Sequence, residues 1–81
     1  MDRVIVVRAT WDPEAQVWVA ESTDVPGLVT EAATIDKLQA KLPGLIQDLL
    51  ESDDEGLLIE VPVEILASIS QRVKVRTRAA A

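Results

Sequence analysis

The stretch Asp-Val-Pro-Gly at residues 24–27 most constrains the fold, because it separates a part of the chain with strand-like patterns from a part with helical spacing. Pro26 fixes φ near the value that the first central position of a turn requires, and Gly27 can adopt the positive φ that the second central position often requires. The sequence therefore predicts a β-hairpin before this turn, and a short strand and a helix after it.

The first strand and its turn are predicted from residues 4–15. Residues 4–10 are mostly apolar and β-branched, with Arg8 as the one charged residue, which is typical of a mostly buried strand. Asp12 stands directly before a proline, and its carboxylate can bond back to the chain while the proline fixes the next φ. We therefore expect residues 11–15 to form the hairpin turn.

Two further strands complete an antiparallel meander, one over residues 16–22 and one over residues 28–32. Side chains of the return strand alternate between the two faces of the sheet. One face receives Val17, Val19 and Glu21, and the other receives Trp18 and Ala20. The alternation leaves open which of these faces packs against the helix.

A helix is predicted over residues 34–51, with Thr34 as its N-cap. Pro43 removes the hydrogen bond to the carbonyl of Gln39, which costs roughly 3 kcal/mol in a helix interior. Nevertheless the apolar stripe continues in phase across the proline, so we expect one kinked helix, with two short helices meeting at Pro43 as the alternative. We expect six residues of the stripe to dominate the core: Ile35, Leu38, Leu42, Leu45, Ile46 and Leu49.

The region after the helix is less regular. Residues 57–63 predict a fourth strand, which a β-α-β crossover would place parallel to a neighbour in the sheet. Pro62 has no N–H, so this strand should lie at an edge or end there. Residues 64–70 are short and ambiguous between helix and strand, and residues 71–77 alternate well enough for a fifth strand that pairs with another chain.

Composition narrows the function. The 81 residues include no Cys and no His, so the usual nucleophiles and near-neutral general bases are absent. We therefore expect a single non-enzymatic domain with no catalytic residue, metal or cofactor. No apolar run reaches the ~18 residues that cross a membrane, and no leader-like segment opens the chain, so we expect a cytoplasmic protein without a membrane partner. Small domains often supplement their cores by association, and we expect a homo-oligomer or an obligate partner.

The net charge of −6 is unevenly distributed. Residues 1–71 contain four basic and fourteen acidic side chains, a net charge of −10, whereas residues 72–81 contain four basic side chains and no acid. An acidic body repels a phosphate backbone, and the basic tail has no aromatic side chain on which bases could stack. We therefore do not expect nucleic acid as a partner, and residues 71–81 are interpreted as a solvated or intermolecular strand.

Taken together, several segments resemble the HicB-like antitoxin family, most closely a stand-alone bacterial branch of it. The resemblance covers about the first fifty residues and rests on Val4-Ile5-Val6-Val7, Trp11-Asp12, Val17-Trp18-Val19-Ala20, the turn and strand from Asp24 to Thr30, and Thr34 before the helix. The chain departs from the family pattern at Ala32 and Ala33, where Gly and Asp are frequent. A full antitoxin usually continues into a C-terminal DNA-binding domain, which we do not expect in this chain.

The resemblance implies an α+β fold of order β-β-β-α-β, similar to a truncated ribonuclease H-like sheet with one helix on one face, with room for an additional C-terminal strand. It also implies a protein that self-associates and masks a small basic, RNA-cleaving toxin. An acidic body is suited to such a partner, because complementary potentials raise the encounter rate.

Two functional hypotheses follow. The leading one is an antitoxin-like protein-binding module that sequesters a small basic toxin. The alternative is a self-assembling structural or regulatory protein that oligomerises through its sheet edge and C-terminal strand. Six residues are candidate contacts with a partner or with a second copy, although Trp18 also suits the core and Asp24 also suits a purely structural turn: Trp18, Glu21, Asp24, Arg72, Lys74 and Arg76.

Overall fold

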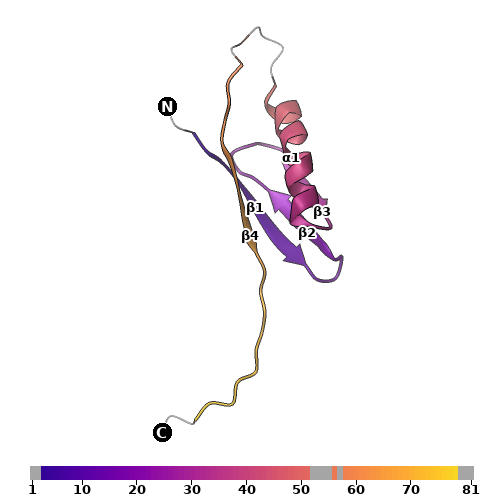
Figure 1. The fold of residues 1–81 in the computed structure, drawn as a ribbon, viewed down its shortest axis with the longest axis vertical. Coiled ribbons are helices and arrows are strands. Elements are labelled where there is room, and N and C mark those ends of the chain that lie inside the picture. The colour runs from indigo at the N-terminus through magenta and orange to yellow at the C-terminus, as the bar shows by residue number, and fades with distance from the viewer. Residues whose placement is uncertain (1–2, 52–55, 57, 79–81) are drawn as a thin grey trace.

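A four-stranded sheet with one helix on one of its faces makes up the body of the protein in a computed structural model, which describes residues 3–51, 56 and 58–78 (Figure 1). The elements in chain order are β1 (Ile5–Asp12), β2 (Val17–Glu21), β3 (Val29–Ala32), α1 (Ile35–Leu50) and β4 (Val63–Ser68). The sheet order is β3-β2-β1-β4, with β1 antiparallel to β2, β2 antiparallel to β3, and β4 parallel to β1. The predicted α+β fold with β-β-β-α-β order and a parallel last strand is confirmed.

The hairpin turn begins two residues later than predicted, because β1 continues through Trp11 to Asp12. Asp12 pairs with Val17 and closes the ladder between the two strands. Its carboxylate Oδ1 accepts hydrogen bonds from the backbone N–H groups of Glu14 (3.0 Å) and Ala15 (3.3 Å). The predicted role of Asp12 as turn initiator is thus confirmed, and the pairing of Trp11 with Trp18 explains why the strand extends further.

The turn between β2 and β3 has the geometry that its sequence predicts. Leu28 donates its N–H to the carbonyl of Val25 at 3.1 Å, and Gly27 has a φ of +87°. A turn with Pro at its first central position and a positive φ at its second is a type II turn, for which glycine is the favoured residue. Val25 and Leu28 are both buried, so the turn is anchored in the core at both ends.

The helix runs without interruption through Pro43, as one helix rather than the two short helices of the alternative. Thr34 is its N-cap and accepts a hydrogen bond from the N–H of Lys37 at 3.1 Å. Gln39 and Pro43 are exposed, so the carbonyl that loses its helical partner can be hydrated.

The core lies between α1 and one face of the sheet. Three members of the predicted stripe are buried in it, whereas Leu49 is 44% exposed and lies against Gly27 of the turn. The expectation that all six stripe residues dominate the core is therefore too broad. The buried residues are Ile5, Val7, Ala9, Ala20, Val25, Leu28, Leu38, Leu42 and Ile46.

The fourth strand was predicted in the wrong place. Residues 58–62 are not a strand, and Leu57 lies outside the described residues; β4 occupies Val63–Ser68 instead. The chain joins β1 where the N–H of Ile5 donates to the carbonyl of Pro62 at 2.9 Å, and the ladder then continues from Val63. Because proline has no N–H to donate, the strand begins after it rather than ending at it. β4 is the last strand of the sheet, as expected for the fourth strand, but Pro62 lies directly before it and not within it.

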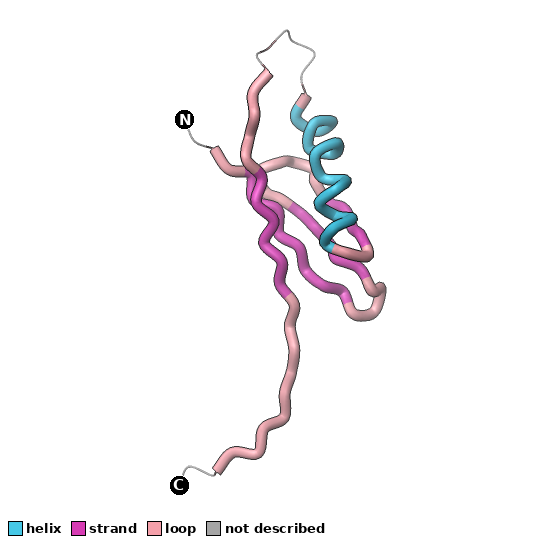
Figure 2. Tube along the Cα trace, in the orientation of Figure 1, coloured by secondary structure: helices cyan, strands magenta, loops and turns pink. Residues whose placement is uncertain are grey.

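Residues 69–78, which we call the arm, continue from β4 as exposed chain that leaves the body (Figure 2). The fifth strand predicted at residues 71–77 is not formed within the single chain, and its pairing with another chain stays a prediction. The radius of gyration is 17.8 Å, whereas a compact domain of this length has about 12 Å. The arm lies outside the body and therefore raises the radius of gyration above that of a compact domain.

Shortening a buried leucine of α1 should cost more stability than shortening an exposed one. Leu38→Ala removes a fully buried side chain and should lower the free energy of unfolding by about 2–5 kcal/mol. The same change at Leu49, which is 44% exposed, is the matched control and should cost clearly less. Urea denaturation of both variants measures the difference, and equal losses would contradict the placement of the core.

Candidate functional site

The face of the sheet opposite α1 is the candidate functional site, and we call it the open face. Among the described residues no helix lies over it, whereas α1 covers the other face (Figure 1). Successive side chains of a strand alternate between faces, so the neighbours of the buried Ile5, Val7 and Ala9 point to the open face. The cross-strand register places these open-face residues side by side: Val6, Arg8, Thr10, Asp12, Val17, Val19, Glu21, Val29, Glu31, Glu64, Leu66 and Ser68.

The open face is acidic. Glu21, Glu31 and Glu64 contribute carboxylates from β2, β3 and β4, and Asp12 contributes a fourth at the end of β1. Arg8 is its one basic residue among the described strands, which leaves a net charge of one minus four, or −3. The Asp12 carboxylate is engaged in the hairpin turn, so the three glutamates are the acids available to a partner.

Apolar side chains lie between these acids. Val29 is 70% exposed and stands opposite Glu21, while Leu66 is 48% exposed and stands opposite Arg8. Val19 pairs with Glu31. Apolar patches framed by charge are typical of surfaces that bind other proteins, in which apolar contact provides affinity and charge selects the partner.

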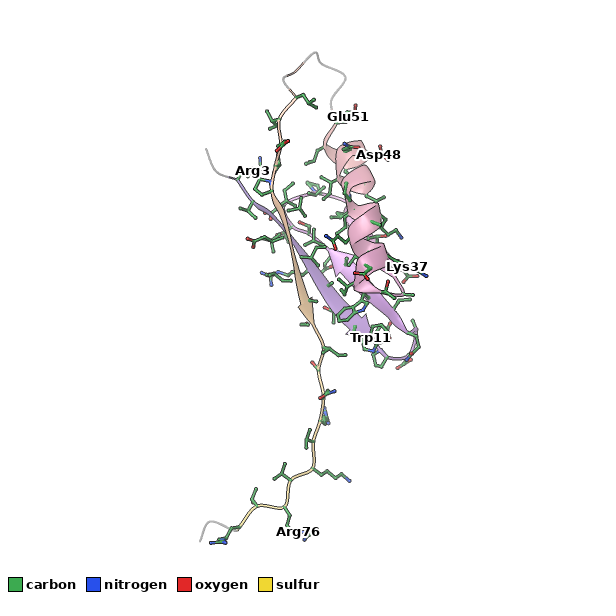
Figure 3. All side chains as sticks on the ribbon, in the orientation of Figure 1. Arg3, Trp11, Lys37, Asp48, Glu51 and Arg76 are labelled. Carbon is green, nitrogen blue, oxygen red and sulfur yellow. The ribbon has the colours of Figure 1, made fainter. Side chains whose placement is uncertain are left out.

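The structure separates the two predicted contact residues of β2. Glu21 is exposed on the open face, whereas Trp18 is partly buried on the helix side and packs against the core. The Trp18 ring lies 5.4 Å from that of Trp11, with the planes at 60°, a favourable tilted arrangement. Figure 3 shows Trp11 near the hairpin end of the sheet. The question of which face of β2 meets the helix is thus answered, and Trp18 has an aromatic partner within its own chain.

Asp24 is occupied in holding β1 to the turn. The ladder between β1 and β2 ends at the pair Arg8 and Glu21, and beyond it side chains replace the missing backbone partners of Val6. The Asp24 carboxylate Oδ2 accepts the N–H of Val6 at 2.8 Å, and the Ser22 hydroxyl donates to the Val6 carbonyl at 2.7 Å. The Ser22 hydroxyl in turn accepts the N–H of Asp24 at 3.1 Å. Sequence reasoning did not single out Ser22, although a Ser-x-Asp just before the Val-Pro-Gly turn could have suggested it.

Arg72, Lys74 and Arg76 are exposed on the arm. Figure 3 shows Arg76 near the far end of the arm, well outside the body. Within one chain the arm therefore does not bring these three residues to the open face beside Glu21.

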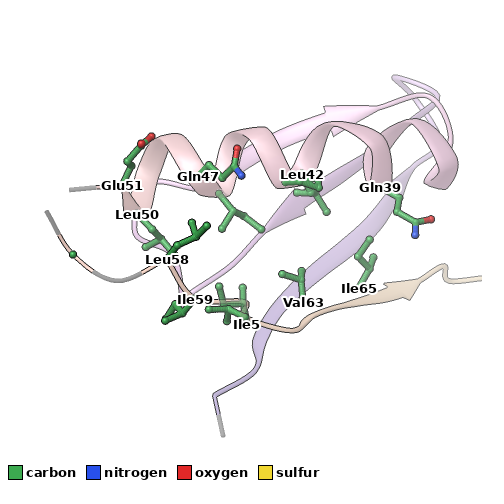
Figure 4. Close-up of a pocket in the computed structure, with 14 residues that line it drawn as sticks. Ile5, Gln39, Leu42, Gln47, Leu50, Glu51, Leu58, Ile59, Val63 and Ile65 are labelled. Carbon is green, nitrogen blue, oxygen red and sulfur yellow. The ribbon is translucent and has the colours of Figure 1, made fainter. Parts of the chain in front are cut away.

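An apolar groove of about 910 Å³ runs between α1 and the chain that leads into β4, and sequence reasoning missed it (Figure 4). Leu42, Ile46 and Leu50 of α1 line one side. Leu58, Ile59, Val61, Val63 and Ile65 line the other side. The signal was present in the apolar run at residues 57–61, which the prediction assigned to a strand.

The described residues contain no group of three or more acidic side chains placed to hold a metal ion. In the same part of the chain, no helix combines the length and the apolar character needed to span a membrane.

Comparison with known proteins identifies relatives without an assigned activity. A family model described as "Domain of unknown function (DUF1902)" matches residues 4–77. The crystal structure of the hypothetical protein TTHA1013 from the extremely thermophilic bacterium Thermus thermophilus is similar, with 48% sequence identity and a TM-score of 0.63. The match covers 90% of this chain and 100% of that chain. Comparison with curated proteins gives no match.

Removing the Asp24 carboxylate should loosen the start of β1. Asp24→Ala leaves the partly buried N–H of Val6 without its acceptor and should lower the free energy of unfolding by about 1–3 kcal/mol. Asp24→Asn keeps an acceptor oxygen at the same place and is the matched control, with a smaller loss expected. Urea denaturation measures stability, and amide exchange of Val6 reports the local effect. An unchanged exchange rate at Val6 in Asp24→Ala would contradict this role.

Proposed function

This chain belongs to the family described as Domain of unknown function (DUF1902), and from that premise we propose that it is a non-enzymatic protein-binding module of the HicB-like antitoxin type. In this proposal it sequesters a small basic, RNA-cleaving protein in the cytoplasm. The proposal rests on the resemblance of its first fifty residues to HicB-like antitoxins and on the character of the open face.

The observation that carries the proposal is the acidic and partly apolar open face. Glu21 and Glu31 lie on neighbouring strands with the exposed Val29 beside them, and both belong to the half of the sheet next to the β3 edge. A basic protein surface with apolar side chains between its cations would complement this pattern. Such a partner gains electrostatic attraction during encounter and apolar contact once it is bound.

The same features argue against other classes of partner. The body repels phosphate groups, since residues 1–71 carry a net charge of −10. The chain has no His or Cys, and the glutamates of the open face come from three different strands and do not gather in a pocket. A protein with a basic surface therefore fits better than a nucleic acid or a small substrate.

Reversing charge on the open face should abolish capture of the basic partner. The double variant Glu21→Lys with Glu31→Lys should weaken binding by tenfold or more, which corresponds to about 1.4 kcal/mol. The measurement is affinity capture of the tagged chain from the lysate of its source at low and high salt, with mass spectrometry of the retained proteins.

The matched control makes the same change of net charge away from the open face. Asp48 and Glu51 are exposed at the C-terminal end of α1 (Figure 3), and Asp48→Lys with Glu51→Lys should leave capture unchanged. A small basic protein that is released by salt, lost in the open-face variant and retained in the control supports the proposal. Recovery of the tagged chain alone, or equal loss in both variants, overturns it.

A further inference from the structure

We propose that two copies of this chain pair by reciprocal exchange of their arms, so that the arm of each copy adds antiparallel to the free edge of β4 in the other. This inference concerns a different edge of the molecule from the surface discussed above, and it does not rest on the proposed function. It commits to a second copy of the chain as the occupant of that edge.

The free edge of β4 presents unpaired backbone groups. β4 is the last strand of the sheet, and its inner side pairs with β1. The carbonyl of Pro62 faces β1, since it accepts the N–H of Ile5. Backbone groups alternate in direction along a strand, so those of Val63, Ile65 and Ala67 face outward. An exposed strand edge of this kind is a template for another extended segment.

The arm is long enough to fill this edge. Ten residues at about 3.3 Å each span about 33 Å, whereas the six residues of β4 span about 20 Å. The arm continues directly from β4 and forms no strand pairing with the other described residues of its own chain. Its apolar side chains are open to solvent, with Val73 at 75% and Val75 at 69% exposed. The arm is therefore long enough to pair along β4, and its exposed valines would be covered by such pairing.

The alternation of side chains fits this pairing on both faces. In a continuous strand the outward backbone groups belong to the odd-numbered residues, so antiparallel pairing sets odd residues opposite odd ones. Val73 and Val75 then lie on the helix side beside apolar residues of β4 such as Ile65. This is the side on which Ile65 lines the groove next to α1, so the valines extend an existing apolar surface.

The even-numbered side chains of the arm from Arg72 to Arg78 are basic, and Glu64 is the acid of β4 on that same open face. Three registers set odd residues opposite odd residues. In them the two-fold axis that relates the two copies passes through residue 69, 70 or 71. In these registers Glu64 stands opposite Lys74, Arg76 or Arg78, respectively. These are non-hydrogen-bonded pairs, whose side chains lie closest, and opposite charges there stabilise the pairing.

Charge also disfavours the main alternative arrangement, in which the arms of the two copies pair with each other. That arrangement would set Arg72, Lys74 and Arg76 against one another, and like charges directly opposite are destabilising. The exchange avoids this repulsion by matching the basic arm with the strand that carries Glu64. In the resulting dimer both helices lie on one side of a continuous sheet, and Glu21 and Glu31 of each copy stay free on the other side.

The test is the mass of the full chain in solution, by size-exclusion chromatography with light scattering. We expect a dimer. Glu64→Lys should raise the dimer dissociation constant by tenfold or more, and so should reversal of the charges of the arm with Arg72→Glu, Lys74→Glu, Arg76→Glu and Arg78→Glu. Combining both sets of changes in one chain should restore the dimer, because the charges are again complementary. Glu31→Lys makes the same charge change as Glu64→Lys on the opposite edge strand and should leave the dimer intact.

Cysteine crosslinking fixes the register, since the natural chain has no Cys. The variant Ser70→Cys should form a disulfide between copies if the axis passes through residue 70. The double variants Ser68→Cys with Ser70→Cys, and Ser70→Cys with Arg72→Cys, report the registers centred one residue earlier and later. A monomer at all concentrations, or a dimer that survives both the arm reversal and deletion of residues 71–81, overturns the proposal. Because no basic partner is present, this outcome is independent of the capture experiment.

Discussion

The structure depends on the burial of alternate side chains of β1 beneath α1. Ile5, Val7 and Ala9 are at most 2% exposed and lie in the central part of the sheet, with β2 on one side and β4 on the other. Leu38 and Leu42 of α1 complete this core. Because a strand can bury only one of its faces against a single helix, the other face of β1 and of its neighbours is left to solvent. The open face is thus a direct consequence of having one helix for one sheet.

That consequence links the fold to the proposed function. A second helix would cover the open face. Here the uncovered strands carry Glu21, Glu31 and Glu64 with exposed valine and leucine between them. The turn after β2 continues the pairing to the start of β1, because Ser22 and Asp24 supply to Val6 the hydrogen bonds that the ladder no longer provides. Asp24 therefore supports the open face indirectly, through its hydrogen bond to the backbone N–H of Val6.

The two proposals assign different parts of the sheet to different partners. The β3 side, with Glu21 and Glu31, is offered to a basic protein, and the β4 edge is offered to a second copy. In the exchanged dimer Glu64 is matched by the basic arm, so the acids that remain for a basic partner lie at the two outer ends of a continuous sheet. Two separated sites on one assembly would allow bivalent binding, in which the second contact is made at a high effective concentration.

Local chemistry in the sequence determined much of this protein. Pro26 and Gly27 specify their turn by fixing or freeing φ, Thr34 caps the helix, and Asp12 initiates the hairpin turn, because each effect acts within a few residues. Only the tertiary structure decided the choices that depend on distant neighbours. The mostly apolar segment at residues 57–63 predicts a strand, yet β4 begins at Val63, because the partner positions along β1 and the missing N–H of Pro62 select the pairing. Likewise Trp18 was assigned to the helix side only by its packing against Trp11 and the core, since alternation separates two faces of a strand but cannot say which one the helix will cover.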